Sequence, residues 1–319
     1  MARIGLSVYG TVFTMGIHSS STQPRITPVQ LMEQALKYHL RGVEMPVSLM
    51  DGEDVATVAQ YAHEHNLFIS LAASGTDLAI LKNAIQLASQ LGAEEVRTVV
   101  GGAKIGGDRR PMAGRWQSFM QEVLSKLREA TTLAERAGVN LAVENHQDLA
   151  SEELLWLCES IASPHFGITL DTGNPLATAE EPVDFAQRVA PFVKNIHLKD
   201  YYIYLSEEGY RLVRSPLGQG VVNFPALFAI FADACPNATM AVELGALEAR
   251  HIRVLTDDYW NEYPPRSAKQ LAAVLRFALD NARLVGNWRT PYERDEPQET
   301  ILTYEKQQLA ASLAYLASL

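Results

Sequence analysis

The stretch FGITLDTGNP, residues 166–175, is a short apolar run that ends in a carboxylate and then enters a turn. Runs that are apolar on successive residues, instead of alternating, are typical of parallel strands covered on both faces. The Asp171 carboxylate at the end of this run has two interpretations. It caps the segment that follows, or the strand presents it as a ligand.

Seven further apolar runs have the same form, and helical periodicity follows each of the eight. The other runs are residues 3–9, 42–47, 67–73, 95–101, 140–146, 193–200 and 239–245. The helical segments are residues 28–41, 52–65, 77–91, 114–138, 151–163, 180–190, 223–235 and 266–285. Eight strand–helix alternations predict an α/β fold, a single (β/α)8 TIM barrel over residues 1–286. No GxGxxG fingerprint follows the first run, which disfavours a dinucleotide-binding sheet.

The end of the chain forms a separate piece. Residues 287–298 indicate a connector, and residues 299–319 predict an additional amphipathic C-terminal helix. We expect residues 287–319 to pack on the barrel or on a partner subunit, so this helix is a candidate contact for a homo-oligomer.

Composition and charge narrow the class of protein. The 319 residues are 47% hydrophobic and 20% charged, as in ordinary globular proteins. The formal net charge of −10 argues against nucleic acid or an anionic membrane surface as partner. Cys158 and Cys235 form no CxxC motif, and the first residues lack the pattern of a secretory leader. We therefore expect a cytoplasmic protein with a small-molecule partner.

Four consecutive strands end in potential metal ligands: Glu144, Asp171, His197 and Glu243. The carboxyl ends of barrel strands meet at one mouth, so the four side chains can converge on one ion. Each residue alone has a structural explanation, such as a helix cap or an ion pair. Three carboxylates buried together would repel one another without a cation. The pattern therefore predicts a site for one divalent metal ion.

Three oxygen donors and one nitrogen donor favour Mn²⁺, Mg²⁺ or Co²⁺, and Zn²⁺ also fits. A six-coordinate ion keeps two positions open for vicinal oxygens of a hydroxy-carbonyl substrate. The predicted chemistry is therefore the formation of a metal-stabilised enediolate.

The motifs ENH, LDTGN, IHLKD and VELG, in this order, resemble the xylose-isomerase-like barrels of the sugar isomerase/epimerase superfamily. The resemblance extends to about residue 285. It implies that Glu144, Asp171, His197 and Glu243 hold the metal. It also implies that Glu144 and Glu243 act as catalytic acid and base on the two sides of the substrate carbon.

The chain departs from two branches of that superfamily. The endonuclease IV branch carries additional histidines after strands three and four, and residues 71–76 and 99–107 contain none. A DNA-repair role is therefore disfavoured. The 3-epimerases of free ketoses carry a histidine and an arginine where this chain has Asn174 and Ile203. The substrate contacts must differ, and simple ketose 3-epimerisation is also disfavoured.

Arginines near the strand ends are candidates for substrate binding: Arg97, Arg214, Arg250 and Arg253. Guanidinium groups pair bidentately with carboxylates and phosphates. The alternative for each is solvation at the surface and pairing with neighbouring glutamates. Together the arginines indicate an anionic substrate, and a carboxylate fits better than a phosphate because no lysine accompanies the PLGQG turn at residues 216–220.

Three further polar residues at strand ends are candidates. His146 contacts substrate hydroxyls or orients the end of its strand, and Asn174 stands where the ketose epimerases bind substrate. Lys199 binds a substrate oxygen or protonates an enediolate, unless it serves as an ion-pair partner of Glu144 or Asp171.

The segments SPLGQGVVNFPAL and ELGALEARHIR resemble the 3-oxo-isoapionate decarboxylase branch. This resemblance implies decarboxylation of a small 3-oxo sugar acid. One alternative is a sugar isomerase or epimerase that acts on a small ketose or keto acid. Another is a non-catalytic sugar-binding barrel, which would have no need of both Glu144 and Glu243.

Overall fold

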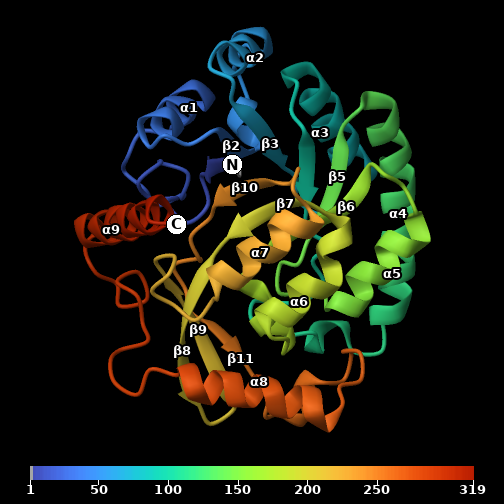
Figure 1. Cartoon of the computed structure of the whole chain (residues 1–319), viewed down its shortest axis with the longest axis vertical. Coiled ribbons are helices and arrows are strands. Elements are labelled where there is room, and N and C mark those ends of the chain that lie inside the picture. The colour runs from blue at the N-terminus through green and yellow to red at the C-terminus, as the bar shows by residue number, and fades with distance from the viewer. Residues whose placement is uncertain (1–2) are drawn as a thin grey trace.

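The computed structural model describes residues 3–319, and eight parallel strands close into a barrel in the order β1-β10-β7-β6-β5-β4-β3-β2. The strands are β1 (Ile4–Ser7), β2 (Gly42–Pro46), β3 (Phe68–Ala72), β4 (Glu95–Thr98), β5 (Asn140–Glu144), β6 (Phe166–Asp171), β7 (Val193–Leu198) and β10 (Thr239–Val242). All eight lie within the apolar runs of the sequence, and the prediction of a (β/α)8 barrel is confirmed (Figure 1).

Seven α-helices between the strands cover the outside of the barrel. They are α1 (Pro28–Lys37), α2 (Val55–Glu64), α3 (Leu78–Leu91), α4 (Trp116–Ala137), α5 (Ser151–Ile161), α6 (Pro182–Val189) and α7 (Phe224–Ala234). Short 3-10 helices span Val47–Met50, Arg110–Met112, Asn174–Thr178, Ala190–Phe192 and Asp257–Tyr259. The helix ends follow local chemistry: Thr27 closes a capping box at the start of α1, and Gly138 ends α4 in the left-handed conformation.

A small antiparallel sheet, here called the appended sheet, lies at one end of the barrel (Figure 1). It consists of β8 (Asp200–Ser206), β9 (Gly209–Ser215) and β11 (Arg250–Ile252), in the order β11-β9-β8. Helix α8 (Ala268–Asn281) packs on this sheet, where Val274 and Ala278 share an apolar cluster with Ile203 and Leu212. None of the predicted strands covers residues 201–215 or 250–252, so the sheet was not predicted.

Helix α9 (Gln298–Ala317) packs on the barrel itself. Its Leu309 belongs to the barrel core, Leu313 and Leu316 pack against that core, and Tyr315 lies 5.8 Å from the ring of Phe224 in α7. The helix expected over residues 266–285 as the eighth barrel helix is α8, which covers the appended sheet instead. Figure 1 shows the two helices on different sides of the molecule, α9 near α1 and α8 beneath the appended sheet.

The turn after β9 is closed by an internal carboxylate. Asp200 accepts hydrogen bonds from the backbone amides of Gly218, Gly220 and Val222, at 2.9–3.0 Å. The PLGQG segment therefore wraps around a side chain of the protein itself, in agreement with its interpretation as a turn and not as a phosphate site.

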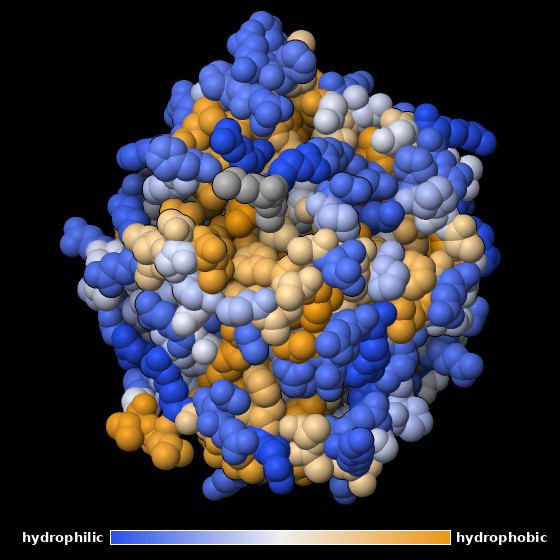
Figure 2. All heavy atoms as spheres, viewed as in Figure 1, coloured by the Kyte–Doolittle hydropathy of each residue, from blue (hydrophilic) through white to orange (hydrophobic). Residues whose placement is uncertain are grey.

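Hydrophilic side chains cover most of the rim of the face in Figure 2, with apolar side chains nearer its middle. In the part of the chain that the structure describes, no helix has both the length and the apolar character needed to cross a bilayer.

Candidate functional site

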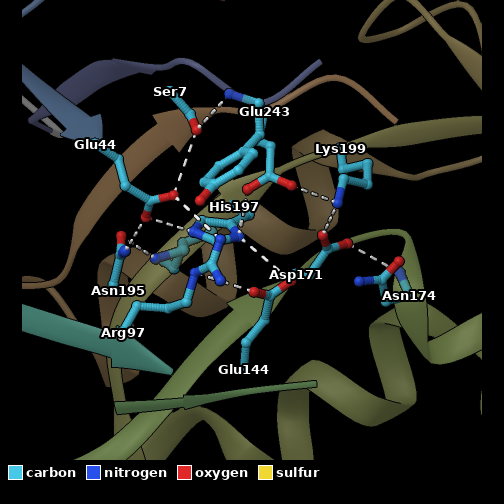
Figure 3. Close-up of polar contacts among 12 residues, drawn as sticks. Ser7, Glu44, Arg97, Glu144, Asp171, Asn174, Asn195, His197, Lys199 and Glu243 are labelled. Atoms are coloured by element: carbon cyan, nitrogen blue, oxygen red, sulfur yellow. Dashed lines mark hydrogen bonds and ion pairs between the residues drawn. The ribbon is translucent and has the colours of Figure 1, made fainter. Parts of the chain in front are cut away.

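Four strand ends bring the predicted ligands together (Figure 3). Glu144 and Asp171 end β5 and β6, His197 lies near the end of β7, and Glu243 follows β10. One donor atom from each lies within 4.8 Å of the others, and all four residues are buried. These residues are here called the ligand quartet. Their convergence follows from the barrel register, in which Asp171 pairs directly with His197.

The donor atoms of the ligand quartet lack ordinary partners. Both carboxylate oxygens of Glu144, Oδ2 of Asp171, Nδ1 of His197 and Oε2 of Glu243 are buried without a hydrogen bond of suitable geometry. His197 Nδ1 nevertheless lies only 2.8 Å from Glu243 Oε2. Buried carboxylate oxygens without donors are costly, and a cation removes that cost. Three carboxylates and one imidazole could therefore hold a divalent ion.

Glu44 of β2 fixes the orientation of the imidazole. Its Oε2 accepts a hydrogen bond from His197 Nε2 at 2.6 Å and another from Asn195 Nδ2 at 3.1 Å, while Oε1 accepts one from the Ser7 hydroxyl. Because Nε2 is held in this way, Nδ1 faces the other three ligands. A carboxylate behind a histidine ligand is a common arrangement at metal sites.

Asp171 caps the segment after β6 with one carboxylate oxygen and could bind an ion with the other. Its Oδ1 accepts hydrogen bonds from the amides of Gly173 and Asn174 at 2.9 and 3.0 Å, while Oδ2 faces the quartet. The Asn145 side chain bonds both backbone groups of Asp171 and holds the strand end. Gly173 has an ordinary φ of −98°, but a Cβ there would lie 2.7 Å from the Tyr201 ring.

Arg97 lies beside the quartet. It does not line the cavity of about 240 Å³ next to the quartet. Its Nε is 3.2 Å from Glu144 Oε2, its Nη2 is 3.8 Å from Glu44 Oε1, and its guanidinium lies over the Tyr9 ring. Burial alone would raise the pKa of Glu144. The positive charge of Arg97 and the nearby histidines outweigh burial, and they hold the pKa of Glu144 below its usual value.

Lys199 pairs with two members of the quartet. Its Nζ is 2.5 Å from Asp171 Oδ2 and donates a hydrogen bond to Glu243 Oε1 at 2.8 Å. Burial would lower the pKa of Lys199, but the charges of Asp171 and Glu243 outweigh it and raise that pKa well above its usual value. Lys199 is therefore an ammonium ion at the edge of the quartet. The ion pair with Asp171 is one of the two that the sequence suggested.

A cavity of about 240 Å³ adjoins the quartet, and it is here called the substrate cavity. The candidate residues in its lining are Glu243, Lys199, His146, Asn174, Arg214 and Arg250. The structure does not bring Arg253 to this cavity, because Arg253 pairs with Glu208 at 3.1 Å and Asp258 at 3.3 Å.

Two arginines of the lining have unpaired donors. Arg214 is 1% exposed; its Nε donates to Gln308 Oε1 and its Nη2 to the Gly10 carbonyl, both at 2.6 Å. Within the described residues 3–319, neither its Nη1 nor the buried Nη1 of Arg250 has a hydrogen-bond partner. Both residues line the substrate cavity, so an anion in the cavity could accept from these nitrogens.

Asn174 also has a free donor in the cavity. Its Oδ1 accepts hydrogen bonds from the Tyr201 hydroxyl and from Gln147 Nε2, both at 3.2 Å. These bonds fix the amide, and Nδ2 is left buried without a partner. His146 is exposed in the same lining. Both residues could therefore meet substrate hydroxyls.

Gln147 and Gln308 were not predicted from the sequence, and no role was predicted for Tyr201. Gln147 and Tyr201 act through Asn174, and Gln308 reaches the site from the C-terminal helix. Their sequence positions carry no motif or periodicity that indicates a binding role. Only the position of Gln147 near the end of β5 was a signal that could have been used.

Two curated proteins share sequence with the chain. The uncharacterized protein YihM of Escherichia coli K12 is 26% identical over 222 residues, which cover 66% of this chain and 64% of that protein. The 3-oxo-isoapionate decarboxylase of Pectobacterium atrosepticum is 29% identical over 124 residues, which cover 38% of this chain and 45% of that enzyme. The chain thus spans less than two thirds of either relative.

A family model described as the xylose isomerase-like TIM barrel matches residues 32–246, which is more than half of the chain. Among solved structures, a xylose isomerase-like TIM barrel protein from Mycobacterium smegmatis in complex with magnesium has the same fold. Its TM-score is 0.60 at 14% identity, and the superposition covers 89% of this chain and 98% of that one. The chain belongs to the xylose isomerase-like TIM barrel family.

Proposed function

We propose that the protein is a divalent-metal-dependent decarboxylase of a small 3-oxo sugar acid. The observation that carries this proposal is one cavity lined by Glu243 of the ligand quartet, by Lys199, and by Arg214 and Arg250, whose Nη1 atoms are unpaired among residues 3–319. The two arginines match a substrate carboxylate, and the quartet side matches oxo and hydroxyl oxygens. A neutral ketose would bring no negative charge to the unpaired Nη1 atoms of Arg214 and Arg250.

The ligand quartet would hold the ion, with Mn²⁺, Mg²⁺ or Co²⁺ favoured and Zn²⁺ also compatible. The magnesium in the Mycobacterium smegmatis structure supports a hard divalent ion. When bound, the ion supplies electrostatic stabilisation of negative charge on the substrate oxygens.

The side chains of the cavity then have distinct roles. Arg214 and Arg250 hold the substrate carboxylate, and Asn174 and His146 orient the hydroxyl groups. The bond between the carboxylate and the neighbouring carbon breaks, and its electron pair passes toward the 3-oxo group to form an enediolate as CO₂ leaves. Lys199 gives a proton from Nζ to that carbon and is reprotonated by water. The neutral product has no carboxylate for the arginines and leaves the cavity.

Isomerisation or epimerisation of a small ketose or keto acid is the second candidate, because both glutamates of the quartet flank the cluster in the manner of an acid and a base. It needs a carboxylate that removes a proton from carbon. Here Arg97 lies against Glu144, and Lys199 lies against Glu243. A neighbouring cation weakens a carboxylate as a base. Decarboxylation needs a proton donor instead, and the partial relative from Pectobacterium is a decarboxylase by name.

The test is a labelling experiment with metal-reconstituted protein in D₂O. With 3-oxo sugar acids we expect release of CO₂ and one carbon-bound deuterium in the product. Deuterium in recovered ketose without CO₂ would establish the isomerase. Binding of sugars without either reaction would indicate a non-catalytic sugar-binding barrel.

A further inference from the structure

Arg214 is a buried cation whose immediate partners are all neutral. Its hydrogen bonds go to the Gln308 amide and the Gly10 carbonyl, and its guanidinium lies 5.5 Å from the centre of the Tyr304 ring. The neighbouring acid Glu305 is committed elsewhere, because it accepts hydrogen bonds from the Phe13 and Thr14 amides and from the Thr14 hydroxyl. A buried charge without a counter-ion is costly.

Arg214 also lines a second hollow, and among the described residues no counter-ion comes from its lining either. This hollow of about 450 Å³ lies between the appended sheet, the connector and α9. Arg214, Arg283, Arg289 and Arg294 line it, and no acidic side chain among residues 3–319 does. An anionic ligand in the substrate cavity, which Arg214 also lines, would supply a negative charge next to it.

Helix α9 is fixed at the point where it meets Arg214. Glu305 ties one turn of the helix to the loop after β1, and Ser312 Oγ accepts a hydrogen bond from the Leu217 amide one turn beyond Gln308. Gln308 itself is 5% exposed. All of α9 lies outside residues 32–246, the part of the chain that matches the family model.

We infer that α9 contributes to the substrate site and that Gln308 is a positioning residue for Arg214. Its amide oxygen orients the guanidinium without neutralising it, so the charge stays available for the substrate carboxylate. This inference rests on the proposed acid substrate and goes beyond it by assigning specificity to the C-terminal helix. The decisive property of Gln308 is its neutrality, because a carboxylate in the same place would become the internal counter-ion.

The test compares Gln308→Glu and Gln308→Met in the full chain loaded with Mg²⁺. The probe is D-erythronate, a sugar acid without a 3-oxo group, titrated calorimetrically, with erythritol as its neutral counterpart. Gln308→Glu should keep or raise the melting temperature, keep the Mg²⁺ affinity, and bind erythronate about 10- to 100-fold more weakly. Gln308→Met should weaken erythronate binding less, because the charge of Arg214 remains. In turnover of the acid substrate, both variants should raise KM more than they lower kcat.

Gln307→Glu is the matched control, because it adds the same charge on an exposed position of the same helix turn. Erythronate binding by Gln308→Glu at wild-type strength would overturn the inference, and so would an equal loss in Gln307→Glu. If Gln308→Glu does not fold, Gln308→Met decides: wild-type KM and erythronate affinity would overturn the inference. Wild-type protein that binds erythronate but releases no CO₂ from 3-oxo acids would refute the proposed reaction and leave the role of Gln308 intact. Wild-type protein that does not prefer erythronate to erythritol would refute both.

Discussion

The ligand quartet reaches the substrate cavity through Glu243, and Arg214 lines the same cavity, but the two are built in different ways. The quartet stands on the ends of four parallel barrel strands. Arg214 stands on β9 of the appended sheet and is held by Gln308 of α9 and by the backbone at Gly10. The side that could hold an ion thus comes from the barrel framework, and the side that could select a substrate comes largely from additions to it.

The two sides also differ in charge. The quartet gathers three carboxylates beside Arg97 and Lys199, whereas Arg214 hydrogen-bonds to no acidic side chain among residues 3–319. A substrate with oxo and hydroxyl oxygens at one end and a carboxylate at the other is complementary to both. Under the proposed function, the barrel would supply the chemistry, and the residues added to the barrel would select the substrate.

The largest effect is expected on the quartet side. Glu243→Gln keeps the shape of the side chain but removes a charged ligand, and we expect kcat/KM to fall about 1000-fold or more. EDTA should abolish activity of the wild type, and added Mg²⁺ or Mn²⁺ should restore it. Steady-state rates and metal titration measure both. Full activity in Glu243→Gln and after EDTA would show that the quartet holds no catalytic ion.

Lys199→Met tests the proposed proton donor. It removes the proposed proton donor with little change in volume, and kcat should fall about 100- to 1000-fold while KM changes little. The rate of CO₂ release and the deuterium content of the product are the measurements. A rate within threefold of the wild type would exclude Lys199 as the proton donor.

Arg214→Met tests the proposed contact between Arg214 and the substrate carboxylate. Loss of a charge-assisted contact to the carboxylate should raise KM about 100-fold, with a smaller change in kcat because the contact forms already in the ground state. Arg253→Met is the control, since Arg253 pairs with Glu208 and Asp258 away from the cavity. Equal effects of the two substitutions would contradict the assignment of Arg214.

The smallest effect is expected at Glu44, which accepts a hydrogen bond from His197 of the quartet. Glu44→Gln should weaken metal affinity about tenfold, because the His197 imidazole loses its charged acceptor, while activity at saturating metal should change little. Glu95→Gln is a matched control inside the barrel. Burial raises the pKa of Glu95 to about 8, so the side chain is already neutral at pH 7. Similar metal affinities of the two variants would argue against a special role for Glu44.

The barrel and the quartet were predictable because their signals are local. A parallel strand covered on both faces shows as an apolar run, and a ligand such as Asp171 shows as a polar residue where that run stops. The register of a closed barrel then brings such residues together. The sequence near Asp171 could not decide between helix cap and ligand: one carboxylate oxygen accepts the amide hydrogen bonds, and the other could bind an ion.

The sequence could not predict which arginines line the substrate cavity. Arg214, Arg250 and Arg253 all occur in segments that read as loops, yet the first two line the cavity and Arg253 does not. The difference depends on the hairpin of β8 and β9 and its pairing with β11. Antiparallel pairing between segments about 40 residues apart leaves no short-range pattern.

By itself, the sequence determined the eight strand–helix units, the ligand types at four strand ends and the acidic balance of the chain. These properties follow from side-chain periodicity and composition, which each segment carries alone. Only the tertiary structure decided that α9 packs on the barrel while α8 covers the appended sheet. It also decided that Gln308 would meet Arg214. Both helices bury apolar residues, and the surface against which such residues pack depends on the complementary surfaces that the rest of the fold leaves uncovered.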